Sequence, residues 1–140
     1  MPGAKVARGG WVYAGGRAGN KPPPAEKAAI TAACDRFIAD VLIPRFLPQV
    51  RPNATFNYPV ALYGKWLGNK YRFLTRYRSD DPRSIAPEFD APFARLDYVS
   101  QDAFDLFWHR HTGAWICLFQ HVSLAEGLRL IESEPYFAPC

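Results

Sequence analysis

The segment AFDLFWHRHTGAWICLFQ, residues 103–120, decides the fold. Two runs rich in apolar and aromatic residues, 103–109 and 114–120, flank the short sequence His111-Thr112-Gly113. Runs of this length around a glycine-containing loop are typical of two antiparallel strands joined as a β-hairpin. The segment therefore predicts a sheet, and the remaining strands are expected on its N-terminal side.

The length of the loop determines which residues of the two strands face each other. A three-residue loop pairs Arg110 with Ala114 and Trp108 with Ile116, whereas a two-residue loop would place Trp108 opposite Cys117. We prefer the three-residue loop because it gathers the apolar side chains on one face of the hairpin. That face consists of Phe104, Leu106, Trp108, Ile116 and Leu118.

Alternation of apolar and polar residues extends the sheet towards the N-terminus. Segments 55–66 and 70–78 alternate with a period of two, and Gly68 and Asn69 between them suit a tight turn. Residues 93–99 form a further strand, after an acidic, proline-containing surface loop at 79–92. The apolar positions of the first of these strands are Phe56, Tyr58, Val60, Leu62 and Trp66. We expect about five antiparallel strands, paired as a meander.

A helix is predicted on each side of the strands. Residues 24–43 repeat apolar side chains every three or four positions, and Pro44 is expected to end this helix. Residues 123–133 begin with Ser123 and Glu126 at the spacing of a capping box. The apolar stripe of the first helix is Ile30, Cys34, Phe37, Ile38, Val41 and Leu42. The predicted class is α+β, with an N-terminal helix, the sheet and a C-terminal helix.

The net charge of +4 resides in the N-terminal segment. Residues 1–24 carry four basic and no acidic side chains, whereas the 13 acidic side chains of the protein all follow and are balanced by the remaining basic ones. The same segment is rich in glycine and proline. We therefore expect a basic tail at 1–24 and a single domain at 25–140. The neutral charge of the domain weakens the inference from the basic pI that the whole domain binds nucleic acid.

Two features of composition bear on location. No apolar run approaches the roughly 18 residues of a membrane span, and the N-terminus lacks the apolar core of a secretory signal. The three cysteines, Cys34, Cys117 and Cys140, form no motif and are odd in number, which indicates reduced thiols. The sequence predicts a cytoplasmic protein that does not associate with membranes.

The C-terminal third carries a recognisable set of motifs. It contains Arg-His-Thr-Gly-x-Trp at 110–115, Ser-Leu-x-Glu at 123–126 and Pro-x-Phe-x-Pro at 135–139. In this order the motifs resemble those of a group of small, uncharacterised bacterial proteins that carry a domain of unknown function. The matching positions are Arg110, His111, Thr112, Gly113, Trp115, Ser123, Leu124, Glu126, Pro135, Phe137 and Pro139. The resemblance implies a small, soluble bacterial protein and supplies no activity.

Basic residues repeat along the strand at 70–78. Its basic side chains are Lys70, Arg72, Arg76 and Arg78. Alternate residues of a strand lie about 7 Å apart on one face, which is close to the spacing of phosphates along a single nucleic-acid strand. This strand is a candidate surface for RNA or another anionic partner. The alternative is that the acidic residues of the following segment neutralise it, namely Asp80, Asp81, Glu88 and Asp90.

The tail offers a second candidate for an anionic partner. Arg8 and Arg17, each next to paired glycines, bracket Trp11 and Tyr13, as in RGG segments that bind RNA. Two alternatives remain: a solubilising segment, or a short strand at 11–13 that adds to a sheet edge of this protein or of a partner.

His109, His111 and Cys117 are the candidate metal or catalytic residues. The ligand types suit zinc, and a Cys–His pair could serve nucleophilic catalysis. The structural alternative assigns His111 to the turn, stacks His109 on Trp115, and treats Cys117 as a small buried apolar residue. Asp97 and Asp105 could pair across the sheet, but they are expected to face water or to meet Arg95 and Arg72 there.

Together, these observations favour a non-enzymatic binding module without a cofactor, whose partner is a protein or an anionic polymer such as RNA. The alternative is a small metal protein or enzyme centred on the hairpin. A third possibility is a homo-oligomer that covers its own aromatic sheet face.

Overall fold

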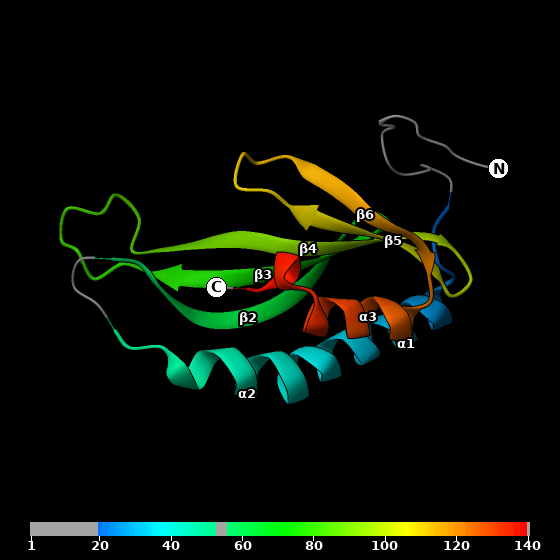
Figure 1. The fold of residues 1–140 in the computed structure, drawn as a ribbon, viewed down its shortest axis with the longest axis horizontal. Helices are drawn as coiled ribbons and strands as arrows, with labels where there is room; N and C mark the ends of the chain where they lie inside the picture. The colour runs from blue at the N-terminus through cyan, green and yellow to red at the C-terminus, as the bar shows by residue number, and fades with distance from the viewer. Residues whose placement is uncertain (1–19, 53–55, 140) are drawn as a thin grey trace.

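The computed structural model of the protein describes residues 20–52 and 56–139. Five antiparallel strands form one sheet in chain order, and the helices lie on one face of it (Figure 1). The strands are β2 (Tyr58–Leu67), β3 (Lys70–Arg78), β4 (Glu88–Ser100), β5 (Ala103–His109) and β6 (Trp115–Val122). The helices are α1 (Pro24–Phe37), η1 (Ile38–Leu42), α2 (Ile43–Phe46), η2 (Leu47–Gln49), α3 (Leu124–Ser133) and η3 (Pro135–Phe137). The predicted α+β meander is confirmed.

The first helix runs past the proline that was expected to end it. Pro44 lies inside α2, and the helical path continues through η2 to Gln49. Immediately before Pro44, η1 is a π turn in which the N–H of Ile43 donates to the carbonyl oxygen of Ile38, five residues back. A π turn is wider than an α turn, which gives the proline ring room that a regular helix denies it. The prediction that Pro44 stops the helix is therefore wrong.

The turn between β2 and β3 forms as predicted. Leu67 pairs with Lys70, and Gly68 adopts a positive φ of 63°. The buried side-chain amide of Asn69 donates to the carbonyl oxygen of Asn20 at 3.0 Å, which attaches the start of the helical layer to the turn. One expectation fails: Phe56 lies before β2 and is 70% exposed, because the strand begins only at Tyr58.

Strand β4 is longer than the sequence suggested. It starts at Glu88 rather than at residue 93, so part of the predicted surface loop belongs to the sheet. A register shift at Phe93 separates its two halves, and in the first half Phe89 stacks on Tyr77 of β3 with ring centroids 5.4 Å apart. A proline and two acidic residues make this half of the strand hard to recognise in the sequence.

The β5–β6 hairpin has the predicted three-residue loop. The N–H of Arg110 donates to the carbonyl oxygen of Ala114 at 2.9 Å, and Trp108 pairs with Ile116. Further from the loop the register shifts, so Leu106 faces Phe119 rather than Leu118. The loop chemistry thus determines the register near the turn, and an irregularity in β6 changes it beyond.

Helix α3 begins at the predicted cap. The Ser123 hydroxyl accepts from the N–H of Glu126 at 3.1 Å. The Glu126 carboxylate does not complete the capping box, because it accepts from the Arg129 guanidinium at 2.9 and 2.6 Å instead. Gly127 permits close packing, since a Cβ there would lie 3.1 Å from Cδ2 of Leu96 in β4.

The core fills the space between the sheet and the helices. Its members come from α1, η1, the sheet, α3 and η3, and include Ile30, Cys34, Ile38, Leu42, Phe73, Leu96, Phe104, Leu106, Ile131 and Phe137. In the described part of the chain, no helix is long and apolar enough to cross a lipid bilayer.

Candidate binding site: a cleft beside strand β4

Half of strand β4 has a neighbour on one side only. Strand β5 pairs with β4 no further than Trp108, which faces Ala94. Residues 88–93 of β4 continue alongside β3, but on the other side they pair with no strand among residues 20–52 and 56–139. We call residues 88–93 the open half of β4.

The backbone groups at this edge follow from the ladder. The N–H of Ser79 donates to the carbonyl oxygen of Pro87 at 2.8 Å, so these two residues form a hydrogen-bonded pair. Because such pairs alternate along an antiparallel ladder, Phe89 and Ala91 bond to β3, whereas the backbone groups of Glu88, Asp90 and Pro92 point to the unpaired side. The N–H that Pro92 lacks would point to the unpaired side, so the proline costs the β3–β4 ladder no hydrogen bond. This placement is typical of proline in an edge strand.

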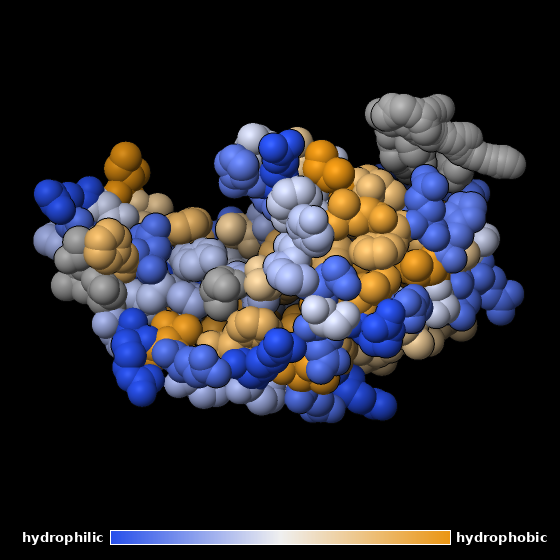
Figure 2. Space-filling model, in the orientation of Figure 1, coloured by the Kyte–Doolittle hydropathy of each residue, from blue (hydrophilic) through white to orange (hydrophobic). Residues whose placement is uncertain are grey.

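A cleft of about 340 Å³ adjoins the open half. Figure 2 shows the surface hollowed between the hairpin tip and the end of the molecule that carries the 79–87 loop. The lining residues come from β3, β4, the hairpin and the C-terminal segment: Tyr77, Ala91, Pro92, Phe93, Trp108, His109, His111, Tyr136, Ala138 and Pro139. Aromatic and proline side chains dominate, and the ionisable side chains are the two histidines and the two tyrosines.

Three of the four basic side chains of β3 have carboxylate partners. Arg76 binds Asp90 at 2.9 Å and Arg78 binds Glu88 at 2.8 Å, both across to the open half of β4. Lys70 lies 3.7 Å from Asp97. Two of the acids considered in the sequence thus neutralise the strand. The other two do not, because Asp81 binds Arg83 and Asp80 accepts from the Tyr58 hydroxyl.

Arg72 is the exception. Within the described residues it has no ion pair, and its buried Nε has no hydrogen-bond partner. The residues opposite it on both neighbouring strands are also cationic, Lys65 in β2 and Arg95 in β4. Its guanidinium carbon lies 5.6 Å from the ring centroid of Trp115. The centre of the helix-free face therefore carries a positive charge that no carboxylate offsets directly.

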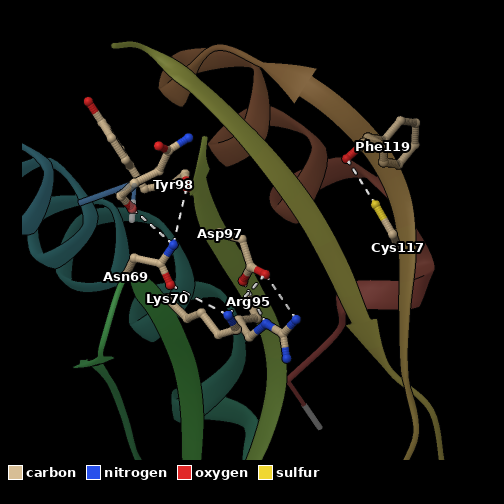
Figure 3. Close-up of polar contacts among 8 residues, drawn as sticks. Asn69, Lys70, Arg95, Asp97, Tyr98, Cys117 and Phe119 are labelled. Atoms are coloured by element: carbon tan, nitrogen blue, oxygen red, sulfur yellow. Dashed lines mark hydrogen bonds and ion pairs between the residues drawn. The ribbon is translucent and has the colours of Figure 1, made fainter. Parts of the chain in front are cut away.

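A buried ion pair lies next to Arg72. Figure 3 shows Arg95 and Asp97 of β4 pointing towards each other, with Nε and Oδ1 2.7 Å apart. The Arg95 guanidinium is sandwiched by two aromatic rings, 4.1 Å from the centroid of Phe107 and 4.8 Å from that of Trp115. Burial raises the pKa of Asp97, and the guanidinium of Arg95 opposes that shift. Because Nε and Nη2 of Arg95 both donate to Asp97 and two aromatic rings cover the guanidinium, Arg95 is less available to a ligand than Arg72.

The structure places two of the three hairpin residues at the cleft and the third, Cys117, within strand β6. His109 pairs with Trp115 across the hairpin, as the structural alternative expected, but the rings meet edge to face at 60° with centroids 4.7 Å apart rather than stacked. Both histidines line the cleft. Cys117 lies opposite Phe107, and burial, followed by the nearby charges of Asp105 and Asp97, raises its pKa to about 12. Over the described ranges no three His, Cys, Asp or Glu side chains converge in a way that could hold a metal ion.

Asp97 and Asp105 do face each other across β4 and β5, but both are buried rather than in water. Asp105 accepts from the backbone N–H of His121 at 3.0 Å. His121 has a positive φ of 56°, so this bond stabilises an irregular position of β6.

Several cleft residues had no signal in the sequence, because they come from separate segments. Tyr77, Phe93, Trp108 and Tyr136 meet only after the sheet folds. One signal was available: Pro92 lies two residues before Ala94, and a proline next to a predicted strand favours an edge position. Four predicted binding residues of the tail, Arg8, Trp11, Tyr13 and Arg17, lie outside the described residues.

The fold and the cleft define a small α+β domain with an interrupted sheet edge. The sequence pattern of one family, a domain of unknown function (DUF3024), matches residues 22–139, and the chain belongs to that family. No curated protein matches the chain, and no solved structure does.

Proposed function

We propose that this protein is a non-enzymatic binding module that takes an extended segment of a partner protein along the open half of β4. The observation that carries the proposal is that β4 continues past the end of β5 beside a cleft lined with aromatic side chains. The unpaired N–H and C=O groups of Glu88 and Asp90 supply main-chain bonds, and the cleft receives side chains of the guest. We assign this activity to the cytoplasm of a bacterium.

The other edges of the sheet support the proposal less well. Strand β2 has a register shift near Val60, and its neighbour Pro59 has no N–H. Strand β6 is interrupted by register shifts and by the positive φ of His121. Such irregularities blunt an edge against strand pairing. The open half of β4 spans about 17–20 Å, which suits a guest strand of five or six residues.

RNA is the partner class that these contacts favour less. Binding along β3 would require cations at alternate positions, and Arg76 and Arg78 are already engaged by Asp90 and Glu88. A guest RNA would have to displace both carboxylates.

The test uses the full chain and a display library of random ten-residue peptides. We expect selected peptides in which apolar side chains alternate, and slowed hydrogen exchange of the Asp90 amide when such a peptide is added. Substitution Ala138→Trp fills the cleft, and we expect it to weaken binding about tenfold or more. The matched control is Ala125→Trp, at an exposed position of α3, and this variant should bind peptides as the wild type does.

Three outcomes would overturn the proposal. They are the absence of any enriched peptide, equal binding by Ala138→Trp, and binding that leaves exchange at Asp90 unchanged. Tight binding of a 12-nucleotide single-stranded RNA, with no peptide enriched, would indicate that the partner is RNA rather than a protein.

A further inference from the structure

Arg72 stands out among the charged groups of the described chain. Lys70, Arg76, Arg78 and Arg95 each have a carboxylate within 4.0 Å, at 3.7, 2.9, 2.8 and 2.7 Å. Arg72 has none, and its Nε is buried without a partner in the described residues. Buried donors in folded proteins are nearly always satisfied, so an unsatisfied one calls for an explanation.

The surroundings of Arg72 make the arrangement unfavourable for the free protein. Arg72 and Arg95 face each other between hydrogen-bonded pairs of the ladder, where side chains approach most closely. Lys65 faces Arg72 from the other side. Like charges in these positions destabilise a sheet. Asp97 and Asp105 are buried near this cluster, and Lys65 also interacts with Asp90, which Arg76 binds. Among the described residues, the five cations Lys65, Lys70, Arg72, Arg76 and Arg95 therefore outnumber these three acids.

The position of Arg72 connects it to the cleft. Its guanidinium lies against Trp115, the ring of Trp115 contacts His109, and His109 lines the cleft. Two residues further along β3, Leu74 faces Pro92, another lining residue. Two successive ring contacts thus link the Arg72 side chain, on the helix-free face, to a residue that lines the cleft.

We propose that Arg72 is the anchor for a carboxylate of the guest peptide, with Trp115 as the wall of that subsite. The inference rests on the proposed function, because the guest reaches Arg72 along the open half of β4. A planar guanidinium with free donors matches a carboxylate in a two-point contact. The bound carboxylate satisfies the buried Nε and offsets the charge of the cluster. Two sources share this chemistry, an Asp or Glu side chain and the C-terminal carboxylate of the guest.

The experiment selects peptides on the wild-type protein and on Arg72→Met. One library presents internal peptides and the other presents peptides with a free C-terminus, which distinguishes the two sources of the carboxylate. We expect enrichment of an acidic residue in the first library or of the free terminus in the second. Loss of the two-point contact should weaken binding of the enriched peptide about ten- to a hundredfold in Arg72→Met. An uncharged version of the same peptide should bind both proteins equally.

Two further variants control the result. Arg36→Met removes the same charge from the exposed surface of α1 and should keep the acid preference. Arg72→Met should unfold at a temperature no lower than the wild type, because it relieves repulsion from Lys65 and Arg95. Should it fail to fold, Arg72→Lys keeps the charge without the fork, and we expect an intermediate loss of affinity.

The outcomes separate the two proposals. Peptides that are enriched without any acid or terminal preference, or that bind Arg72→Met as tightly as the wild type, overturn the role of Arg72 and leave the binding module intact. If neither library yields an enriched peptide, both the role of Arg72 and the proposed binding module are overturned.

Discussion

Gly64 of β2 lies directly beneath the ring of Tyr71. A Cβ at position 64 would overlap the hydroxyl and the ring of Tyr71, which is 1% exposed. The same hydroxyl donates to Asp35 of α1 at 2.8 Å, so the tyrosine cannot easily move away. The absence of a side chain at one strand position therefore allows a hydrogen bond between the sheet and the first helix.

Substitution Gly64→Ala is expected to lower the free energy of unfolding by about 1–3 kcal/mol, the usual range for overpacking a core. Urea denaturation measures the change. In a double-mutant cycle with Tyr71→Leu the two effects should be less than additive, because the smaller side chain makes room for the methyl group. Full additivity would contradict this account of Gly64.

A second residue-scale prediction concerns Cys117. Burial raises the pKa of its thiol to about 12, so at pH 8 the thiolate is about a thousandfold scarcer than for an ordinary cysteine. In a Cys140→Ser background, a chromogenic disulfide reagent should react with the folded protein far more slowly than with the protein in denaturant. Cys34, whose pKa is likewise raised to about 12, should behave in the same way. Rapid reaction of the folded protein would instead support the alternative in which Cys117 of the hairpin is a reactive thiol.

Local chemistry explains which single residues the sequence could predict. The loop His111-Thr112-Gly113 and the cap at Ser123 depend on groups a few positions away, and both form as expected. Glu126 does not, because Arg129 offers its carboxylate a charged partner one turn along the helix. The sequence also could not predict that Arg72 lacks a carboxylate partner among the described residues, since this depends on where the acids of β4 lie.

At the scale of elements, Tyr63, Arg76 and Asp90 join β2, β3 and β4. The Tyr63 hydroxyl and the Arg76 guanidinium both donate to the Asp90 carboxylate, at 2.5 and 2.9 Å. The guanidinium, and then the hydroxyl, lower the pKa of Asp90. This contact links the middle of the open half of β4 to both neighbouring strands.

The lowered pKa gives a pH-dependent prediction with a definite sign. A carboxyl whose pKa is lower in the folded state stabilises the fold above its ordinary pKa, and that stability is lost as the pH falls. Asp90→Asn should therefore cost about 0.2–1 kcal/mol at pH 7, as expected for a partly exposed pair, and the difference from the wild type should shrink below about pH 4. Thermal unfolding at a series of pH values measures it. Asp40→Asn, which removes an exposed carboxylate of η1, is the control.

The boundaries of two elements escaped the sequence for a common reason. Pro44 is a strong local signal against helix, and the acids Glu88 and Asp90 are signals against strand, yet the folded chain accommodates both. The π turn of η1 accommodates the proline, and salt bridges to Arg76 and Arg78 accommodate the acids in β4. The existence and order of the elements were nevertheless predictable, because hydrophobic periodicity depends on many residues at once.

At the scale of the whole molecule, the cleft is a product of topology. Its lining residues lie in β3, β4, the hairpin and the C-terminal segment, from Tyr77 to Pro139. Of these, the sequence singled out only His109 and His111 as site residues, and it did so for metal chemistry. A site assembled from four segments leaves no motif, so only the folded chain reveals it.

The interrupted sheet predicts an alternating pattern of hydrogen exchange in the free protein. The amides of Phe89 and Ala91 bond to β3 and should exchange about a hundredfold or more slowly than those of Glu88 and Asp90, which face the open side. Amide exchange followed by NMR measures each position separately. Equal protection of all four amides in a monomer would mean that another segment of the chain already covers the edge. Equal protection only in a dimer, detected by sedimentation, would point to a second copy.

Pro92 has a consequence for the sequences that this edge accepts. The open half presents two N–H groups, from Glu88 and Asp90, but three carbonyl oxygens, because Pro92 contributes an acceptor and no donor. A strand that satisfies all of them must offer three N–H groups at alternate positions, whereas only two of its carbonyl groups find a donor on β4. Proline at any of those three positions leaves a carbonyl of β4 unmet, so the backbone alone filters candidate guests before any side chain enters the cleft.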